Sequence, residues 1–184
     1  SLLVAVAIVI FGATVLSLLE PLLPLHLQRR LQGNPTSIGL IFAAAVVAYG
    51  VCSPLAGWLA DRIGRRPVMF GAMLASSVAL PLIALPQTWW GEGVALALLG
   101  TTCAFLLTPA LPELADQLDR GGSQAYGVAY AIFNTAYAIG MLAGPLAGGA
   151  AAEAWGFLAT LAILGTLALA SLPGLCWLAR VGDR

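Results

Sequence analysis

Glu20 is the side chain in this sequence that most clearly suggests chemistry. It lies about two-thirds of the way along the first long apolar run, where Pro21 and Pro24 follow it. A charged acid near the centre of a bilayer costs about 2.5–3.5 kcal/mol to insert, so such an acid normally faces a cavity, a partner or water. Exclusion of water also favours the protonated form of a carboxyl group. We therefore consider Glu20 a candidate for binding protons, with a position near the outer membrane surface as the alternative.

A second group of candidates lies in the fifth apolar run, where Tyr126, Tyr130, Asn134 and Tyr137 follow the spacing i, i+4, i+8 and i+11. This spacing places the four side chains along one face of a helix. Tyrosine rings attract organic cations through their π faces, and the Asn134 amide has several hydrogen-bonding positions to satisfy. The stripe predicts an aromatic wall for an organic ligand, and aromatic packing is the alternative.

The same run continues into a glycine stripe at Gly140, Gly144 and Gly148, interrupted by Pro145. Small residues at every fourth position let another helix backbone approach closely. On an ideal helix the tyrosine and glycine stripes point to roughly the same side. Spacing alone therefore leaves open which of them lines a cavity and which forms a packing surface.

Acidic residues gather at the end of the fourth apolar run, at Glu113, Asp116 and Asp119. Acids at a helix C-terminus oppose the helix dipole, so each should have an arginine partner or be solvated. Arg120 is the nearest arginine in the sequence. We expect Asp119 to be a solvated loop residue.

The composition excludes several classes of protein. Hydrophobic residues make up 60% of the 184 positions, charged residues 9%, and the formal net charge is zero, whereas an average soluble domain has roughly 25% charged residues. A soluble domain, a nucleic-acid-binding protein and a disordered segment are therefore excluded. The single histidine, His26, and the three cysteines are not arranged as a catalytic or metal-binding motif. We expect no enzyme activity, no metal and no cofactor.

Six apolar runs are each long enough to cross a bilayer, which requires about 20 residues. We therefore expect an all-α membrane protein with one bundle over residues 1–184. The expected helices cover approximately residues 2–26, 36–60, 67–85, 93–114, 124–150 and 155–180.

Arginine placement predicts the orientation of these helices. An even number of spans puts both termini on one side of the membrane, and the arginines on that side outnumber those on the other. Positive residues remain on the cytoplasmic side, so both termini should be cytoplasmic, in a bacterial-type inner membrane. The first group is Arg62, Arg65, Arg66, Arg120, Arg180 and Arg184; the second is Arg29 and Arg30.

The connection between the second and third runs resembles the signature loop of the major facilitator superfamily, G-x-L-a-D-r-x-G-r-r/k. The resemblance implies that this loop latches one half of a transporter against the other and opens during transport. The matching residues are Gly57, Asp61, Arg62, Gly64, Arg65 and Arg66.

Two further segments resemble the drug/proton antiporters of this superfamily. The glycines around Pro145 are similar to the antiporter motif g-x-x-x-G-P-x-x-G-G, and residues 19–24 are similar to the first helix of the C-terminal half of vesicular amine transporters. The matching motif residues are Gly140, Gly144, Pro145, Gly148 and Gly149. The vesicular transporters also carry acids in the fourth and fifth helices of this half, where Leu107 and Asn134 occur here. A multidrug or metabolite antiporter is therefore favoured over a vesicular amine exchanger.

The resemblance implies one six-helix half, made of 3+3 inverted repeats, of a twelve-helix proton-coupled exporter of lipophilic or cationic compounds. Its implied partners are the lipid bilayer, protons, a small-molecule substrate, and a second half or a second copy of this chain. The chain starts inside an apolar run at Ser1. We expect it to be a piece of a longer chain, or a chain that was trimmed for study. The alternatives are a half-transporter that acts as a homodimer and a membrane assembly domain that does not transport.

Overall fold

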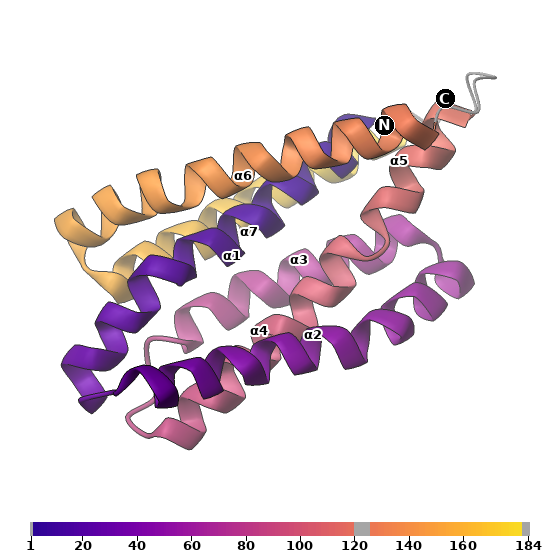
Figure 1. The fold of residues 1–184 in the computed structure, drawn as a ribbon. Helices are drawn as coiled ribbons and strands as arrows, with labels where there is room; N and C mark the ends of the chain where they lie inside the picture. Colours follow the sequence, from indigo (N-terminus) through magenta and orange to yellow (C-terminus); the bar gives the residue numbers. More distant parts are fainter. Residues whose placement is uncertain (1, 120–125, 182–184) are drawn as a thin grey trace.

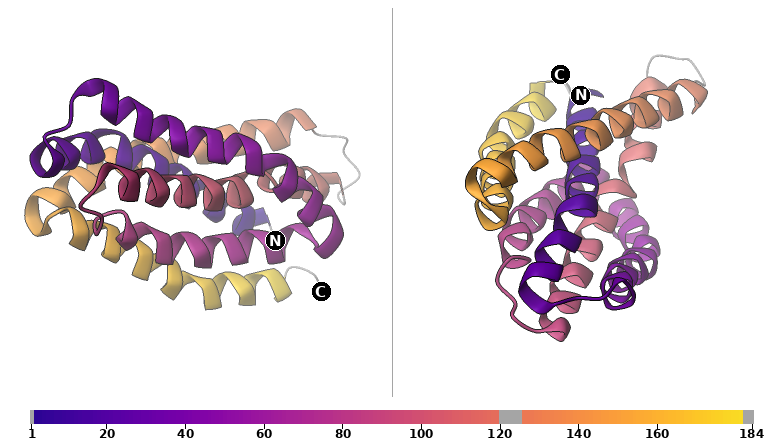
Figure 2. Two further views of the ribbon diagram at one scale, coloured as in Figure 1. Left: turned by 90° about the horizontal axis from the view of Figure 1, so that it is seen from below. Right: turned by 60° about the vertical axis from the view of Figure 1, so that its left-hand side comes forward.

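The computed structural model describes residues 2–119 and 126–181, and the regular secondary structure of these residues is helical. The helices form a bundle in which the start of α1 and the end of α7 lie at the same end (Figures 1 and 2). Their bounds are α1 Leu2–Leu31, α2 Pro35–Ile63, α3 Arg65–Leu82, α4 Trp89–Leu107, α5 Ala110–Asp119, α6 Tyr126–Trp155 and α7 Phe157–Val181.

Within residues 2–119 and 126–181, five helical stretches are long and apolar enough to cross a membrane. They are α1, α2, α6, α7, and α4 together with α5. Five of the six expected spans therefore meet this criterion, and the remaining one, α3, does not. Two arginines, Arg65 and Arg66, begin α3, and they make its 18 residues less apolar than the other spans.

The expected continuous helix over residues 93–114 is wrong in two respects. It begins earlier, at Trp89, because the Thr88 hydroxyl accepts a hydrogen bond from the Gly91 N–H at 3.2 Å and caps the helix. It also breaks at Thr108 and Pro109, since a proline has no N–H to continue the helical hydrogen bonds. The short α5 then leads from α4 toward the start of α6 (Figure 1).

The most extensive helix contacts join α1 with α6 and α2 with α4, and smaller ones join α3 with α7 and with α4. Glycines lie in the contacts α1–α6, α2–α4 and α3–α7, where a side chain would collide with the partner helix. A Cβ atom on Gly100 of α4 would lie 2.2 Å from the Ala45 carbonyl oxygen, and one on Gly165 of α7 would lie 2.5 Å from the Ser77 carbonyl oxygen. Close backbone approach of this kind is how helices pack inside a bilayer.

Burial is uneven among the helices. In the most apolar 18-residue segment of α1, and in that of α4 with α5, more than half of the residues are buried. The corresponding share is only 11% in α2 and 22% in α6 and in α7. Large apolar residues such as Val47, Val51 and Leu142 are exposed on these outer helices. In a bilayer such surfaces face lipid or another protein.

Candidate functional site

A cavity of about 480 Å³ lies between α1, α2, α4 and α6. This volume falls within the roughly 300–1,000 Å³ that is usual for small-molecule sites. Most of the lining side chains are apolar, and Glu20, Tyr49 and Tyr137 supply the polar groups. The lining residues are Leu16, Leu19, Glu20, Phe42, Ala45, Val46, Tyr49, Leu96, Leu99, Gly100, Leu107, Phe133 and Tyr137.

Glu20 reaches the cavity from α1, which continues as a helix past Pro21 and Pro24 to Leu31. Leu16, Leu19 and Glu20 share one helix face at the spacing i, i+3 and i+4. The Glu20 side chain is exposed in the cavity wall, and its carboxyl group lies close enough to the Tyr137 hydroxyl to interact electrostatically. A carboxylate beside a phenol in an apolar cavity can bind either a proton or an organic cation.

Tyr49 is a lining residue that the sequence analysis missed. It lies near the middle of α2 and interacts with the Thr108 side chain at the break between α4 and α5. Its neighbours in the cavity wall are Phe42, Ala45 and Val46, so the wall residues follow the spacing i, i+3, i+4 and i+7. The spacing can be read from the sequence. Because most of α2 is apolar, however, periodicity does not distinguish this face of the helix from its other faces.

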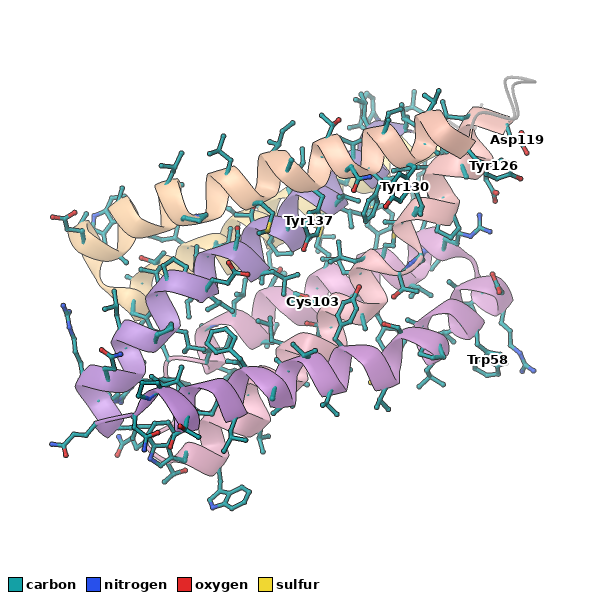
Figure 3. All side chains as sticks on the ribbon, in the orientation of Figure 1. Trp58, Cys103, Asp119, Tyr126, Tyr130 and Tyr137 are labelled. Carbon is teal, nitrogen blue, oxygen red and sulfur yellow. The ribbon has the colours of Figure 1, made fainter. Side chains whose placement is uncertain are left out.

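The tyrosine stripe of α6 divides between two places. Tyr137 lines the cavity, whereas Tyr130 and Asn134 are exposed and lie outside its lining. Tyr126 and Tyr130 instead border a separate depression beside Arg65. Figure 3 shows the three tyrosines along α6, from its beginning toward its middle. The tyrosine stripe therefore does not form one continuous wall of the cavity.

The glycine stripe of α6 is a packing surface against α1. A Cβ atom on Gly140 would lie 2.5 Å from the Ile10 carbonyl oxygen, and one on Gly148 would lie 2.6 Å from the Leu18 side chain. The buried Ser17 hydroxyl donates a hydrogen bond to the Gly140 carbonyl oxygen at 3.2 Å. Pro145 is exposed, and a Cβ atom on Gly149 would contact nothing within 4 Å.

The signature loop forms the tight turn between α2 and α3. Gly64 has a φ of +97°, a backbone conformation that other residues rarely adopt, and its N–H donates to the Ala60 carbonyl oxygen at 3.0 Å. The Arg62 guanidinium lies 4.2 Å from the centre of the exposed Trp58 ring. Asp61 is exposed and has no ion pair within the described ranges, and a Cβ atom on Gly57 would meet open space.

The last two arginines of the loop bind the acids of α5. Arg65 forms an ion pair with Asp116 and donates a hydrogen bond to the Pro112 carbonyl oxygen at 3.1 Å. Arg66 Nε donates to Glu113 Oε1 at 2.6 Å. Arg120, the nearest arginine in the sequence, lies outside the described residues. The partners of Asp116 and Glu113 therefore come from a loop 51 and 47 residues away, which sequence proximity did not indicate.

These two ion pairs should differ in their effect on stability. The Arg66 and Glu113 side chains are only 15% and 13% exposed, whereas Asp116 is 58% exposed. We expect Glu113→Gln to lower the free energy of unfolding by about 2 kcal/mol, because it removes a carboxylate that binds a poorly hydrated guanidinium. Asp116→Asn should cost less than about 1 kcal/mol. Detergent-induced unfolding of both variants measures the difference, and equal losses would contradict the expectation.

Comparison with known proteins relates the whole described bundle to one family. The family profile described as Major Facilitator Superfamily matches residues 2–183. The Chromaffin granule amine transporter of Rattus norvegicus is 29% identical over 162 residues, which are 88% of this chain and 31% of that protein. Multidrug resistance protein MdtG of Klebsiella pneumoniae is 33% identical over 156 residues, or 80% of this chain and 37% of that protein.

A third relative extends the similarity to almost the full chain. The Synaptic vesicular amine transporter of Homo sapiens is 26% identical over 179 residues, which are 97% of this chain and 35% of that protein. The chain thus spans about a third of the length of the curated relatives that it matches.

Proposed function

We propose that this chain, which belongs to the major facilitator superfamily and is an integral membrane protein, is half of a proton-coupled antiporter for lipophilic or cationic small molecules. The observation that carries the proposal is the cavity in which Glu20 of α1 lies opposite Tyr49 of α2 and beside Tyr137 of α6. The names of the relatives, which are transporters of amines and multidrug resistance proteins, agree with this substrate class.

Glu20 would act as the exchange site for the proton and the substrate. A proton and an organic cation would compete for the same carboxylate, so binding of one should displace the other. The rings of Tyr49 and Tyr137 would hold the organic part of a cationic substrate. Tyr130 and Asn134, exposed on α6, would face the path to the cavity or the second half of the transporter.

The helix pairing supports a structure built from 3+3 inverted repeats. In such a repeat α1 would correspond to α4, α2 to α6, and α3 to α7. The contact of α1 with α6 would then correspond to that of α4 with α2, and the contact of α3 with α7 would correspond to itself. These three pairs are among the four most extensive helix contacts of the bundle; the fourth, α3 with α4, would correspond to the smaller contact of α7 with α1. A half of this kind would work by alternating access, as it rocks against a second half around the shared cavity.

The signature loop and the antiporter motif would serve this movement in different ways. The exposed Asp61 and the open surface at Gly57 would meet the second half, so that Asp61 finds its partner there and the loop acts as a latch. The glycine stripe of α6 would keep α1 and α6 together as one body while the two halves separate.

Both termini would lie in the cytoplasm of a bacterial-type inner membrane. Arg62 lies in the last turn of α2, and Arg65 and Arg66 begin α3. The junction of these two helices is at the same end of the bundle as the start of α1 (Figure 1). Positive residues near membrane spans remain on the cytoplasmic side.

The mass of the purified particle distinguishes two arrangements of the proposed half-transporter. A second copy of this chain would give a dimer with a two-fold axis through the cavity, whereas a half that pairs with a different six-helix unit would not dimerise. A fold that is intact but carries no flux in liposomes would favour the third arrangement, a membrane domain that only assembles.

Filling the cavity should prevent substrate binding. Val46 lines the cavity, and its neighbour Val47 does not; their side chains are 69% and 63% exposed, so both positions should tolerate a larger residue. We expect Val46→Trp to weaken binding of tetraphenylphosphonium, a lipophilic cation, by about tenfold, or about 1.4 kcal/mol. Val47→Trp should bind it as the wild type does. Equal affinity of both variants in equilibrium dialysis would place the substrate elsewhere.

A further inference from the structure

Glu92 carries a buried carboxyl group that does not line the cavity. It lies in the first turn of α4, with none of its surface exposed. Neither carboxyl oxygen has a hydrogen-bond partner among the described residues. The start of α4 is at the end of the bundle opposite to the chain termini (Figure 1). Glu92 is therefore separate from the arginine-rich loop as well as from the cavity lining.

The surroundings of Glu92 disfavour its charged form. Ala95 and Leu96, one turn further along the same face of α4, belong to a buried apolar cluster with Leu27 and Ile83. An ionised carboxylate that is buried without a hydrogen-bond donor is strongly unfavourable. The N-terminus of α4 attracts negative charge, but this effect is small compared with the loss of hydration. This burial comes from the helices of this chain alone, so it does not depend on a second half.

Arg30 is the cation that acts on Glu92. It lies in the last turn of α1, and its Nη1 donates a hydrogen bond to the Ala84 carbonyl oxygen, just after α3, at 2.5 Å. Arg30 interacts electrostatically with both Glu92 and His26. The other titratable groups at this end are Arg29 on α1 and the exposed Glu153 on α6. The connection of residues 83–88, the first half of α2 and the start of α7 contain no titratable side chain.

We infer that Glu92 is a proton-binding site and that its proton determines which acceptor Arg30 holds. With the proton bound, Glu92 is neutral and Arg30 holds the Ala84 carbonyl oxygen. When the O–H bond breaks and the proton passes to water at this end of the bundle, the carboxylate becomes the stronger acceptor. Arg30 then leaves Ala84 for Glu92, and the connection between α3 and α4 loosens. This inference does not rest on the proposed transport function.

Infrared spectroscopy of the purified protein in lipid nanodiscs tests the inference directly. Near neutral pH, exposed carboxyl groups are ionised, so the C=O band of a protonated carboxylic acid reports a shielded group. We expect Glu92→Gln to remove a component of this band, and Glu153→Gln, the exposed acid at the same end, to leave it unchanged. A wild-type spectrum that Glu92→Gln does not alter would overturn the inference.

A second variant keeps the test decisive if Glu92→Gln fails to fold. Removing the cation with Arg30→Gln should move the pH at which the carboxylic acid band disappears upward by about one unit. An unchanged midpoint would show that Arg30 does not respond to the proton. In the wild type, amide hydrogen exchange at residues 83–88, corrected for the intrinsic dependence of exchange on pH, should become faster above this midpoint. A corrected rate that does not change with pH would contradict the loosening of this connection.

Discussion

Replacement of Glu20 by glutamine is expected to abolish accumulation of substrate that is driven by a pH gradient. Glutamine keeps the size of the side chain in the cavity wall but cannot release a proton. One pH unit corresponds to about 1.4 kcal/mol per proton, which supports about a tenfold accumulation when one proton is exchanged for each substrate molecule. In proteoliposomes with this gradient, Glu20→Gln should reduce the accumulation ratio of tetraphenylphosphonium to about one.

The matched control for this experiment is Glu153→Gln. Glu153 is an exposed acid near the end of α6, and its replacement removes the same charge from the chain without touching the cavity. It should retain the full accumulation ratio. If Glu20→Gln accumulates the cation as well as Glu153→Gln does, the coupling acid is not Glu20.

Replacement of Gly144 by alanine is expected to destabilise the bundle strongly. The added Cβ would lie 2.0 Å from Ser17 Oγ and 2.7 Å from the Thr14 carbonyl oxygen. The Ser17 side chain can rotate, but the Thr14 carbonyl belongs to the backbone of α1, so the two helices must move apart. We expect a loss of about 3 kcal/mol in the free energy of unfolding, at the upper end of overpacking effects. Detergent-induced unfolding measures this loss.

Gly149→Ala provides a control in the same helix and the same motif. A Cβ atom there would contact nothing within 4 Å, so the change should be neutral or should stabilise the helix by up to about 1 kcal/mol. Both glycines belong to the same sequence motif, and the different effects expected for their alanine variants follow from the packing of α6 on α1. Equal effects of the two substitutions would contradict this packing.

The membrane class and the family could be inferred from the sequence because they depend on features that require no tertiary structure. The composition requires a bilayer, and the residues from Gly57 to Arg66 match a contiguous motif. The profile match over residues 2–183 and the amine and multidrug transporters among the relatives confirm the predicted family.

The positions of individual side chains were harder to predict because they depend on which helices pair. The two stripes of α6 point to similar sides of an ideal helix, and only the approach of α1 to Gly140 and Gly144 identifies the glycine stripe as a packing surface. The same contact turns Asn134 away from the cavity lining while Tyr137 remains in it. Periodicity cannot distinguish these outcomes within a single helix.

Long-range polar contacts were also beyond local reasoning. Sequence proximity pointed from the acids of α5 to Arg120, but Arg66 and Glu113, 47 residues apart, form the less exposed ion pair. The short α5 after the break at Pro109 packs mainly on α6 and α1 and also touches α3, and this contact makes the pairing possible. Glu92 was likewise not singled out, because nothing in its local sequence indicates that the surrounding helices exclude water from it.

The central claim is that Glu20 exchanges a proton for a cationic substrate in the cavity between α1, α2, α4 and α6. The most direct measurement is proton release when tetraphenylphosphonium is added to the purified protein in weakly buffered solution with a pH indicator. Our account predicts that the wild type releases protons in proportion to the cation bound and that Glu20→Gln releases none. Binding of the cation by the wild type without proton release, or equal release by Glu20→Gln, would contradict it.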